Sequence, residues 1–163
     1  RTADGGFKQA EVTSCGLNGG PLEGKGTYPA RIACNLWSKN GVCRYDKPFD
    51  KKAHPYFTQR GRDGDKDSVQ YIANMQDGSV AGFKYFNIQD AKVVRIKVSG
   101  KGLGVVQVSA SPDFSKVECE IPVRPEETEK MFSGALNLER NKCPLYFRFQ
   151  GQGYINFWSF ELS

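Results

Sequence analysis

The sequence contains few of the residues on which enzymes depend for acid–base and nucleophilic catalysis. It has one histidine in 163 residues, and that histidine lies in the turn-like sequence Ala53-His54-Pro55. It contains neither the G-x-S-x-G sequence of hydrolase nucleophiles nor a phosphate-binding P-loop. Because a nucleophile needs a base positioned beside it, this scarcity predicts that the chain is not an enzyme.

Cysteines with metal-binding spacing are also missing from the sequence. None of the five cysteines forms a C-x-x-C pair, and a single histidine completes no familiar zinc site with them. An odd number of cysteines leaves at least one thiol free. A disulfide between Cys34 and Cys43 is one possibility, because the turn residues between them would allow the chain to bring the two thiols together. Cys119 lies in an alternating apolar pattern, which predicts a small buried side chain.

No apolar run approaches the roughly 20 residues that span a bilayer, and no signal peptide is recognisable, so we expect no contact with a membrane. The chain starts with Arg1 rather than Met, and we therefore interpret it as a piece of a longer protein.

The net charge of the chain is +5, from 23 basic and 18 acidic residues. The densest charged segments, 46–52 and 60–67, mix both signs, which predicts a solvated surface and no nucleic-acid partner.

Alternation of apolar and polar residues is the strongest pattern in the second half of the chain. A strand places successive side chains on opposite faces, so each alternating segment has one face for a core. In the last such segment, Trp158, Phe160 and Leu162 are expected to share the core face. Residues 125–130 are expected to form an exposed loop. Turn residues separate the segments, which is typical of an all-β, antiparallel β-sandwich. Strands are predicted at 69–75, 80–88, 94–98, 106–109, 117–121, 145–150 and 158–162.

The first 66 residues have a different character, with long stretches rich in Gly, Pro, Lys and Asp around short predicted strands at 7–13 and 30–37. Long loops inside a compact domain are often functional or packed onto something. We therefore expect one module over 1–163, with opening strands and an ordered flap in 1–66 and the main sandwich strands in 67–163. The aromatic residues of this part are too many for a free linker: Tyr28, Trp37, Tyr45, Phe49, Tyr56 and Phe57.

A series of short segments, in order along the chain, carries a resemblance to a known family. The series is 9–11, 70–74, 81–86, 93–98, 105–109, 145–149 and 154–160. Its order resembles that of family 6 carbohydrate-binding modules, which are β-jelly-roll sandwiches attached to plant-polysaccharide hydrolases. Segments 17–21, 26–33 and 54–59 are similar to the C-terminal appendage of bacterial family 43 glycoside hydrolases, mostly xylosidases and arabinofuranosidases. The resemblance implies a jelly roll here and a catalytic five-bladed propeller upstream.

The resemblance also implies where a sugar would bind. Tyr71 matches a tyrosine that forms one wall of a loop-end sugar cleft in the family, whereas the stretch that matches the second, tryptophan wall, 126–131, has no aromatic residue. Tyr154, near the position of a family asparagine that hydrogen-bonds the sugar, and Trp37, in the flap, are the other candidates for carbohydrate contacts. The alternative for Tyr71 is packing within the sandwich, and the alternative for Trp37 is packing within the flap.

A structural calcium ion is the one cofactor that the resemblance implies. Gln9 and Glu11 match the family's ligands on the opening strand, and Asn156 stands where the family has an aspartate on the last strand. That leaves a single carboxylate, where calcium prefers more. We therefore expect a calcium site at these three residues, weakened by the exchange.

Together these features predict a non-catalytic carbohydrate-binding module that holds a plant polysaccharide of the xylan or arabinoxylan class for an attached glycoside hydrolase. Tethering of this kind raises the local concentration of substrate and needs modest affinity. The alternative is a structural appendage that packs on the catalytic domain and shapes its active site without binding sugar; the missing aromatic wall favours it. The expected partners are a polysaccharide or oligosaccharide and the catalytic domain of the parent hydrolase. The expected location is outside a bacterium or at its surface, with the cytoplasm as the alternative.

Overall fold

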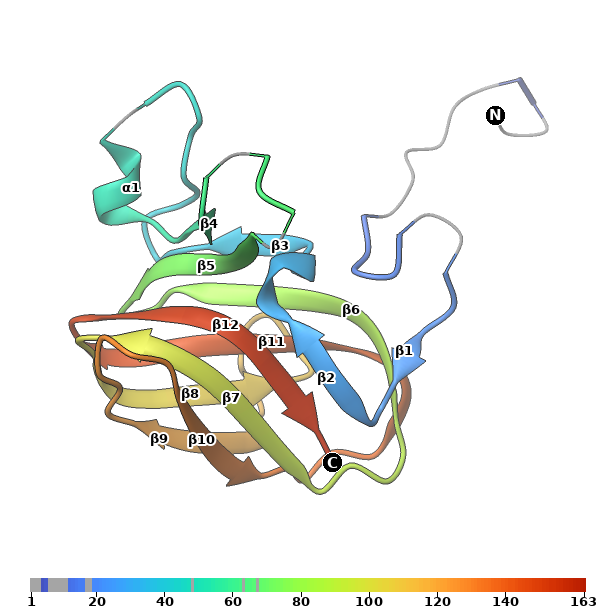
Figure 1. Ribbon diagram of the computed structural model, residues 1–163. Coiled ribbons are helices and arrows are strands. Elements are labelled where there is room, and N and C mark those ends of the chain that lie inside the picture. Colours follow the sequence, from blue (N-terminus) through green and yellow to red (C-terminus); the bar gives the residue numbers. More distant parts are fainter. Residues whose placement is uncertain (1–3, 6–11, 17–18, 48, 63, 67) are drawn as a thin grey trace.

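The chain folds into two β-sheets packed face to face, as the computed structural model in Figure 1 shows. The structure describes residues 4–5, 12–16, 19–47, 49–62, 64–66 and 68–163. The helical elements of this part of the chain are the 3-10 turn η1 (Ala30–Ile32) and the short helix α1 (Asp50–Ala53). Neither is long or apolar enough to cross a membrane. The all-β, antiparallel sandwich that the alternation predicts is confirmed.

Sheet I is built around two long neighbouring strands, β6 and β11. Its strand order is β1-β6-β11-β8-β9, and β3 also pairs with β6. All of these pairs are antiparallel except β1 with β6. The strands of sheet I are β1 (Leu22–Glu23), β3 (Asn35–Trp37), β6 (Val80–Ile88), β8 (Leu103–Ser109), β9 (Cys119–Val123) and β11 (Arg140–Gln152).

Sheet II has the last strand of the sandwich, β12, near its centre. Its order is β10-β7-β12-β5-β4, and all its pairs are antiparallel. β7 runs along one side of β12, while β5 and β2 share the other side, β5 near the start of β12 and β2 near its end. The strands of sheet II are β2 (Gly26–Pro29), β4 (Tyr56–Arg60), β5 (Val69–Gln76), β7 (Val93–Gly100), β10 (Lys130–Ala135) and β12 (Tyr154–Leu162).

The facing sides of the two sheets bury an aromatic core. The rings of Phe83 and Phe147 from sheet I meet those of Phe157 and Phe160 from sheet II, with centroids between 4.9 and 6.2 Å apart. All four side chains are buried. Burying one such side chain contributes about 1.5–3 kcal/mol, so these alternating positions supply much of the stability of the sandwich.

None of the five cysteines, all of which the structure describes, forms a disulfide. The bridge left open between Cys34 and Cys43 is therefore not formed, and both thiols are free and half-buried. Cys119 is buried in the core between the sheets, as its alternating sequence predicts.

A β-bulge in β12 changes which of its residues face the core. The register with β7 shifts between Phe157 and Ser159. Ile155 and Phe157 point into the core before the bulge, and Phe160 does so after it. Trp158, the extra residue, lies outside the core cluster and on the outer face of sheet II. The expectation that Trp158 shares the core face with Phe160 is wrong, because a bulge shifts the alternation by one residue.

Most strands predicted from alternation are present, and the differences fall in the first part of the chain and at β10. The predicted strand 30–37 is instead the turn η1 followed by β3. The predicted strand 7–13 lies mostly outside the described residues. The alternation does not predict β2, β4 and β10. Residues 125–129 form the expected loop, and β10 begins at Lys130.

The segment between β3 and β4 is held against sheet II by hydrogen bonds from β5. Asn74 Nδ2 donates to the carbonyl oxygens of Lys51 at 2.9 Å and His54 at 3.2 Å. Gln76 Nε2 donates to the carbonyl of Lys52 at 2.8 Å. Asn74 has a φ of 59°, a left-handed conformation that asparagine adopts more readily than most residues. These contacts bring β4 to the edge of sheet II, where it pairs with β5.

Candidate functional site

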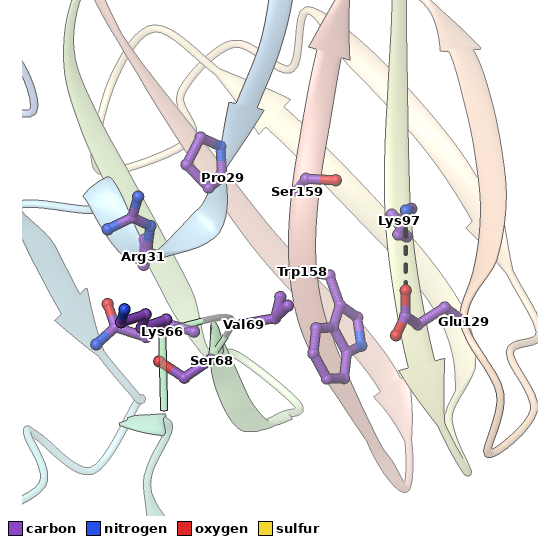
Figure 2. Close-up of a pocket in the computed structure, with 10 residues that line it drawn as sticks. Pro29, Arg31, Lys66, Ser68, Val69, Lys97, Glu129, Trp158 and Ser159 are labelled. Carbon is purple, nitrogen blue, oxygen red and sulfur yellow. Dashed lines mark ion pairs between the residues drawn. The ribbon is translucent and has the colours of Figure 1, made fainter. Parts of the chain in front are cut away.

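The outer face of sheet II contains three adjoining depressions, which we call the outer trough. The central one has a volume of about 530 Å³ and is shown in Figure 2. It shares Arg31 and Gln70 with a depression of about 360 Å³ over β4 and β5. It shares Glu129 and Trp158 with another of about 550 Å³ beside Tyr71. Because neighbouring depressions have lining residues in common, the trough is elongated and open.

Tyr71 and Trp158 stack on each other in the floor of the trough. Their ring centroids are 3.8 Å apart and their planes meet at 25°. The stack forms because Phe157 and Ile72 are cross-strand partners that face the core, which puts the neighbouring residue of each strand on the outer face. Trp158 Nε1 donates to Ser99 Oγ on β7 at 3.0 Å, which fixes the indole. Trp158 is 8% exposed, so the half-buried Tyr71 presents the more accessible ring.

Two further tyrosines and an arginine influence the Tyr71 hydroxyl. Burial raises the pKa of Tyr71 above its usual value, the phenols of Tyr56 and Tyr154 raise it further, and the Arg60 guanidinium lowers it. Both tyrosines lie on strands that pair with β5, Tyr56 opposite Ala73 and Tyr154 opposite Gln76. At neutral pH the Tyr71 hydroxyl is therefore protonated, and it can donate a hydrogen bond to a ligand.

An ion pair crosses the trough over Trp158. Arg60 Nη1 on β4 lies 2.7 Å from Glu129 Oε1, just before β10. The Arg60 guanidinium is 4.9 Å from the ring centroid of Trp158. Lys97 Nζ on β7 lies 3.8 Å from the other oxygen of Glu129, as Figure 2 shows. The Arg60–Glu129 pair thus connects opposite edges of sheet II and covers part of the indole.

Sheet II brings together two of the three residues predicted to contact a sugar. Tyr71 lies in the trough, and Tyr154 begins β12 close by. Trp37 lies instead in β3 of sheet I, where its ring is 6.0 Å from that of Tyr146. It packs there against a small buried cluster that includes Val80 and is separate from the main core. Trp37 thus lies on the outer side of sheet I, whereas Tyr71 lies on the outer side of sheet II. The two residues are therefore on opposite faces of the sandwich.

Of the three residues predicted to bind calcium, Asn156 is the one that the structure describes. Its Oδ1 accepts a hydrogen bond from the backbone N–H of Asn74 at 3.1 Å, and its Nδ2 faces Ser99 Oγ at 3.5 Å. Gln9 and Glu11 lie outside the described residues. In the described part of the chain, no group of three or more His, Cys, Asp or Glu side chains is arranged to hold a metal ion.

Several residues of the trough carry no clear signal in the sequence. Trp158 is hidden by the bulge, because its position in the alternation is that of a core residue. Glu129 lies in the stretch 126–131 that matches the family's missing aromatic wall, and residues of this stretch do line the depression beside Tyr71. The position of Glu129 beside the trough could therefore have been inferred from the resemblance. The ion pair of Glu129 with Arg60 could not.

Comparisons with solved structures identify the class of fold. A β-1,3-glucan-binding family 6 carbohydrate-binding module from Bacillus halodurans superposes with a TM-score of 0.67 at 12% identity, covering 88% of this chain and 98% of that chain. A glycoside hydrolase family 43 arabinoxylan arabinofuranohydrolase from Bacillus subtilis, in complex with cellotetraose, superposes with a TM-score of 0.62 at 15% identity. That match covers 99% of this chain and 32% of the hydrolase. The chain has the fold of the family 6 carbohydrate-binding modules.

A curated enzyme contains a segment similar in sequence to this chain. A xylosidase/arabinosidase from Thermoclostridium stercorarium is 40% identical over 161 residues, which is 98% of this chain. The chain spans about a third, 34%, of the length of this curated relative. No family model matches the chain. The resemblance to a family 6-like module of the kind attached to family 43 glycoside hydrolases is confirmed.

Proposed function

We propose that this chain is a non-catalytic module that binds a plant cell-wall polysaccharide of the xylan or arabinoxylan class for an attached glycoside hydrolase. The xylosidase/arabinosidase relative and the arabinoxylan-acting neighbour support this polymer class. Such polymers are too large to enter a cell, so we expect the protein to act outside the cell or at its surface. The single observation that carries the proposal is the Tyr71–Trp158 stack in the floor of an open, elongated trough.

The trough offers what a sugar chain requires. A sugar ring has an apolar face that packs on an aromatic ring, and hydroxyl groups that need fixed polar partners. Tyr71 supplies the ring, and Trp158 stacks against one of its faces. Asn156 and Thr128 line the same depression and supply polar atoms, as does Gln70 in the central depression. An elongated trough fits several consecutive sugars of a chain better than it fits one small molecule.

The acidic residues of the trough support binding rather than glycoside hydrolysis. Hydrolysis needs two carboxyl groups that flank one bond, one of them protonated. Glu129 is held in the ion pair across the trough, and Glu127 lies 2.9 Å from Lys101. Lys101 lowers the pKa of Glu127, first through its hydrogen bond, so this carboxyl is ionised at neutral pH. His54 lines none of the three depressions.

The proposal is tested by the affinity of the chain for defined polymers. Titration calorimetry and affinity gels with xylohexaose, arabinoxylan, cellohexaose and mixed-linkage β-glucan would measure binding. We expect the Tyr71→Ala variant to lose affinity for xylan by about tenfold or more, because it removes the accessible ring. Tyr45→Ala is the matched control, since Tyr45 is fully exposed and lines none of the three depressions.

Binding of xylohexaose by the wild type and by Tyr45→Ala, together with its loss in Tyr71→Ala, would support the proposal. Equal affinity of Tyr71→Ala and the wild type would contradict the site. Absence of binding to every polymer would contradict the function itself.

A specific observation favours a second candidate function, that of an appendage docked on the catalytic domain. Val42, Tyr45 and Phe49, between β3 and β4, are all strongly exposed apolar side chains. Exposed apolar groups gathered in one segment are typical of an interaction surface. The curated relative is about three times as long as this chain, so it contains a further part against which such a segment could pack.

The second candidate is tested in a full-length enzyme that carries this module. A double substitution, Tyr45→Ser with Phe49→Ser, is expected to lower the thermal stability or the activity of the catalytic domain if the segment docks on it. In the isolated chain the same variant should bind polysaccharide as the wild type does. Unchanged stability and activity of the full-length variant would contradict docking through this segment.

A further inference from the structure

The central depression of the outer trough carries a concentration of positive charge. Figure 2 shows Arg31 and Lys66 on one side of Trp158, and the Lys97–Glu129 pair on the other side. Glu129 is the only carboxylate among the described residues that line the central depression, and it is also paired with Arg60. It is therefore already neutralised.

Arg31 and Lys66 have no ion-pair partner among the residues that the structure describes. Both side chains are exposed. Elsewhere on the surface, basic residues such as Lys39 and Arg95 do have acidic partners, at 3.0 and 2.7 Å. Among the described residues, the central depression thus has two cations without an acidic partner, which a neutral sugar chain would leave without a counter-charge.

Arg31 is held in place by a buried neighbour. It lies in the middle of η1, where Ala30 is fully buried in the core and the Ala33 N–H donates to the Ala30 carbonyl at 3.1 Å. The backbone of Arg31 is therefore anchored, although its side chain is exposed. The exposed guanidinium offers two parallel N–H groups in a planar fork, which matches a carboxylate.

We propose that the side of the central depression formed by Arg31 and Lys66 binds the carboxylate of a uronic acid carried as a side group on the polysaccharide. This inference rests on the proposed function, because the uronate is presented by the polymer that occupies the trough. Gln70, shared by two of the depressions, and Ser68 supply amide and hydroxyl groups for the other oxygens of such a sugar. The module would then prefer acidic xylans over neutral ones.

The test compares one polymer before and after its carboxyl groups are removed. Glucuronoxylan and the same glucuronoxylan with its uronic acids chemically reduced to neutral sugars have the same backbone. We expect the wild type to bind the acidic form about tenfold more tightly, because charge-assisted hydrogen bonds are stronger than neutral ones. Raising NaCl from about 0.05 M to about 0.5 M should reduce this preference, because salt screens exposed charges.

Variants with matched charge show whether the preference is local. Arg31→Gln and Lys66→Gln should each lower the ratio of the two affinities toward one. Arg140→Gln makes the same change in net charge on β11 of sheet I and should keep the ratio of the wild type. Polyglutamate, an acidic polymer without sugars, should compete poorly with glucuronoxylan.

Equal binding of the acidic and reduced polymers by the wild type would overturn the uronate site and leave the proposed function standing. An effect of Arg140→Gln as large as that of Arg31→Gln, or equal competition by polyglutamate, would also overturn it, because either result shows a general attraction to anions. Binding of neither polymer would refute the proposed function as well.

Discussion

Arg60 and Glu129 form an ion pair of 2.7 Å that connects the β4 edge of sheet II to the loop before β10 and passes over the ring of Trp158. The two residues are far apart in the sequence, and each approaches the trough from a different margin. Their contact lies where the depression beside Tyr71 adjoins the central one, since Glu129 and Trp158 line both. A polysaccharide that occupied the whole trough would have to pass over this pair or separate it.

Breaking this pair should expose Trp158 without unfolding the protein. In the variant Glu129→Gln we expect acrylamide to quench the fluorescence of Trp158 more strongly, because Arg60 is no longer held over the ring. The free energy of unfolding should fall by about 1 kcal/mol or less, since Arg60 is exposed and Glu129 is only half-buried. Trp37→Phe provides a background with a single tryptophan, and Glu127→Gln is the matched control. Identical quenching in Glu129→Gln and its parent would contradict the covering role of the pair.

Removing the hydrogen-bond partner of the indole should be more costly. Ser99 is 2% exposed and its Oγ accepts from Trp158 Nε1 at 3.0 Å. In Ser99→Ala the buried indole N–H is left without a partner, so urea unfolding should show a loss of about 1–3 kcal/mol. Ser133→Ala, on the exposed side of β10, should change stability by less than about 0.5 kcal/mol. Equal stabilities of the two variants would mean that this hydrogen bond does not hold the stack.

The buried thiol of Cys119 should make stability fall at high pH. Burial, with a smaller contribution from Glu120, raises the pKa of Cys119 to about 11. In the unfolded chain the thiol ionises near its usual pKa of about 8.5. The folded state therefore keeps a proton that the unfolded state loses, so this contribution is complete below about pH 8.5 and is lost as pH rises toward about 11.

This contribution is measured as the slope of unfolding free energy against pH. Cys119→Ala should have a shallower decline than the wild type between about pH 8.5 and 11. Cys34→Ser, which changes a half-buried thiol outside the main core, is the control. The slope of its unfolding free energy against pH should stay closer to that of the wild type than the slope of Cys119→Ala does. Parallel slopes for the wild type and Cys119→Ala would show that the Cys119 thiol is not the group responsible.

A calcium ion at Gln9, Glu11 and Asn156 remains a prediction from the family resemblance. A site that exists in the folded state alone raises the melting temperature when the ion is added. We therefore expect calcium to raise the midpoint of chelator-treated protein by several degrees, and Glu11→Gln to abolish the rise. Glu139→Gln, an exposed carboxylate on the way to β11, is the control. If the melting midpoint of the wild type is the same in calcium and in chelator, the predicted calcium site is contradicted.

The alternation of apolar residues was sufficient to predict most of the sandwich, because core strands must repeat every second residue. It did not predict β10, where exposure alternates from Met131 to Ala135 but residue type does not, because Met131 and Ala135 are exposed apolar residues and Gly134 holds an inward position. The place of Trp158 depends on the bulge between Phe157 and Ser159, which leaves no mark in the order of residue types. For Trp37, the sequence cannot tell which sheet β3 joins, since that depends on pairing with a strand more than forty residues away.

The candidate site, like the fold, could be predicted from the sequence only in part. Tyr71 and Tyr154 could be named from the resemblance, because they belong to strands whose order the family shares. Arg31 and Arg60 could not, because their positions depend on η1 and β4, two elements of the loop-rich first part that alternation does not predict.

β12 is the last strand of the sandwich in sequence, yet it lies between β7 and β5 in sheet II. Until β12 leaves the ribosome, the edges of β5 and β7 that face it have no partner. The rings of Phe83 and Phe147 then also lack the rings of Phe157 and Phe160, which oppose them in the folded protein. Unpaired edges beside exposed aromatic rings invite association with other chains. A nascent polypeptide that stops before Tyr154 would therefore be a substrate for chaperones or proteases rather than a shortened binding module.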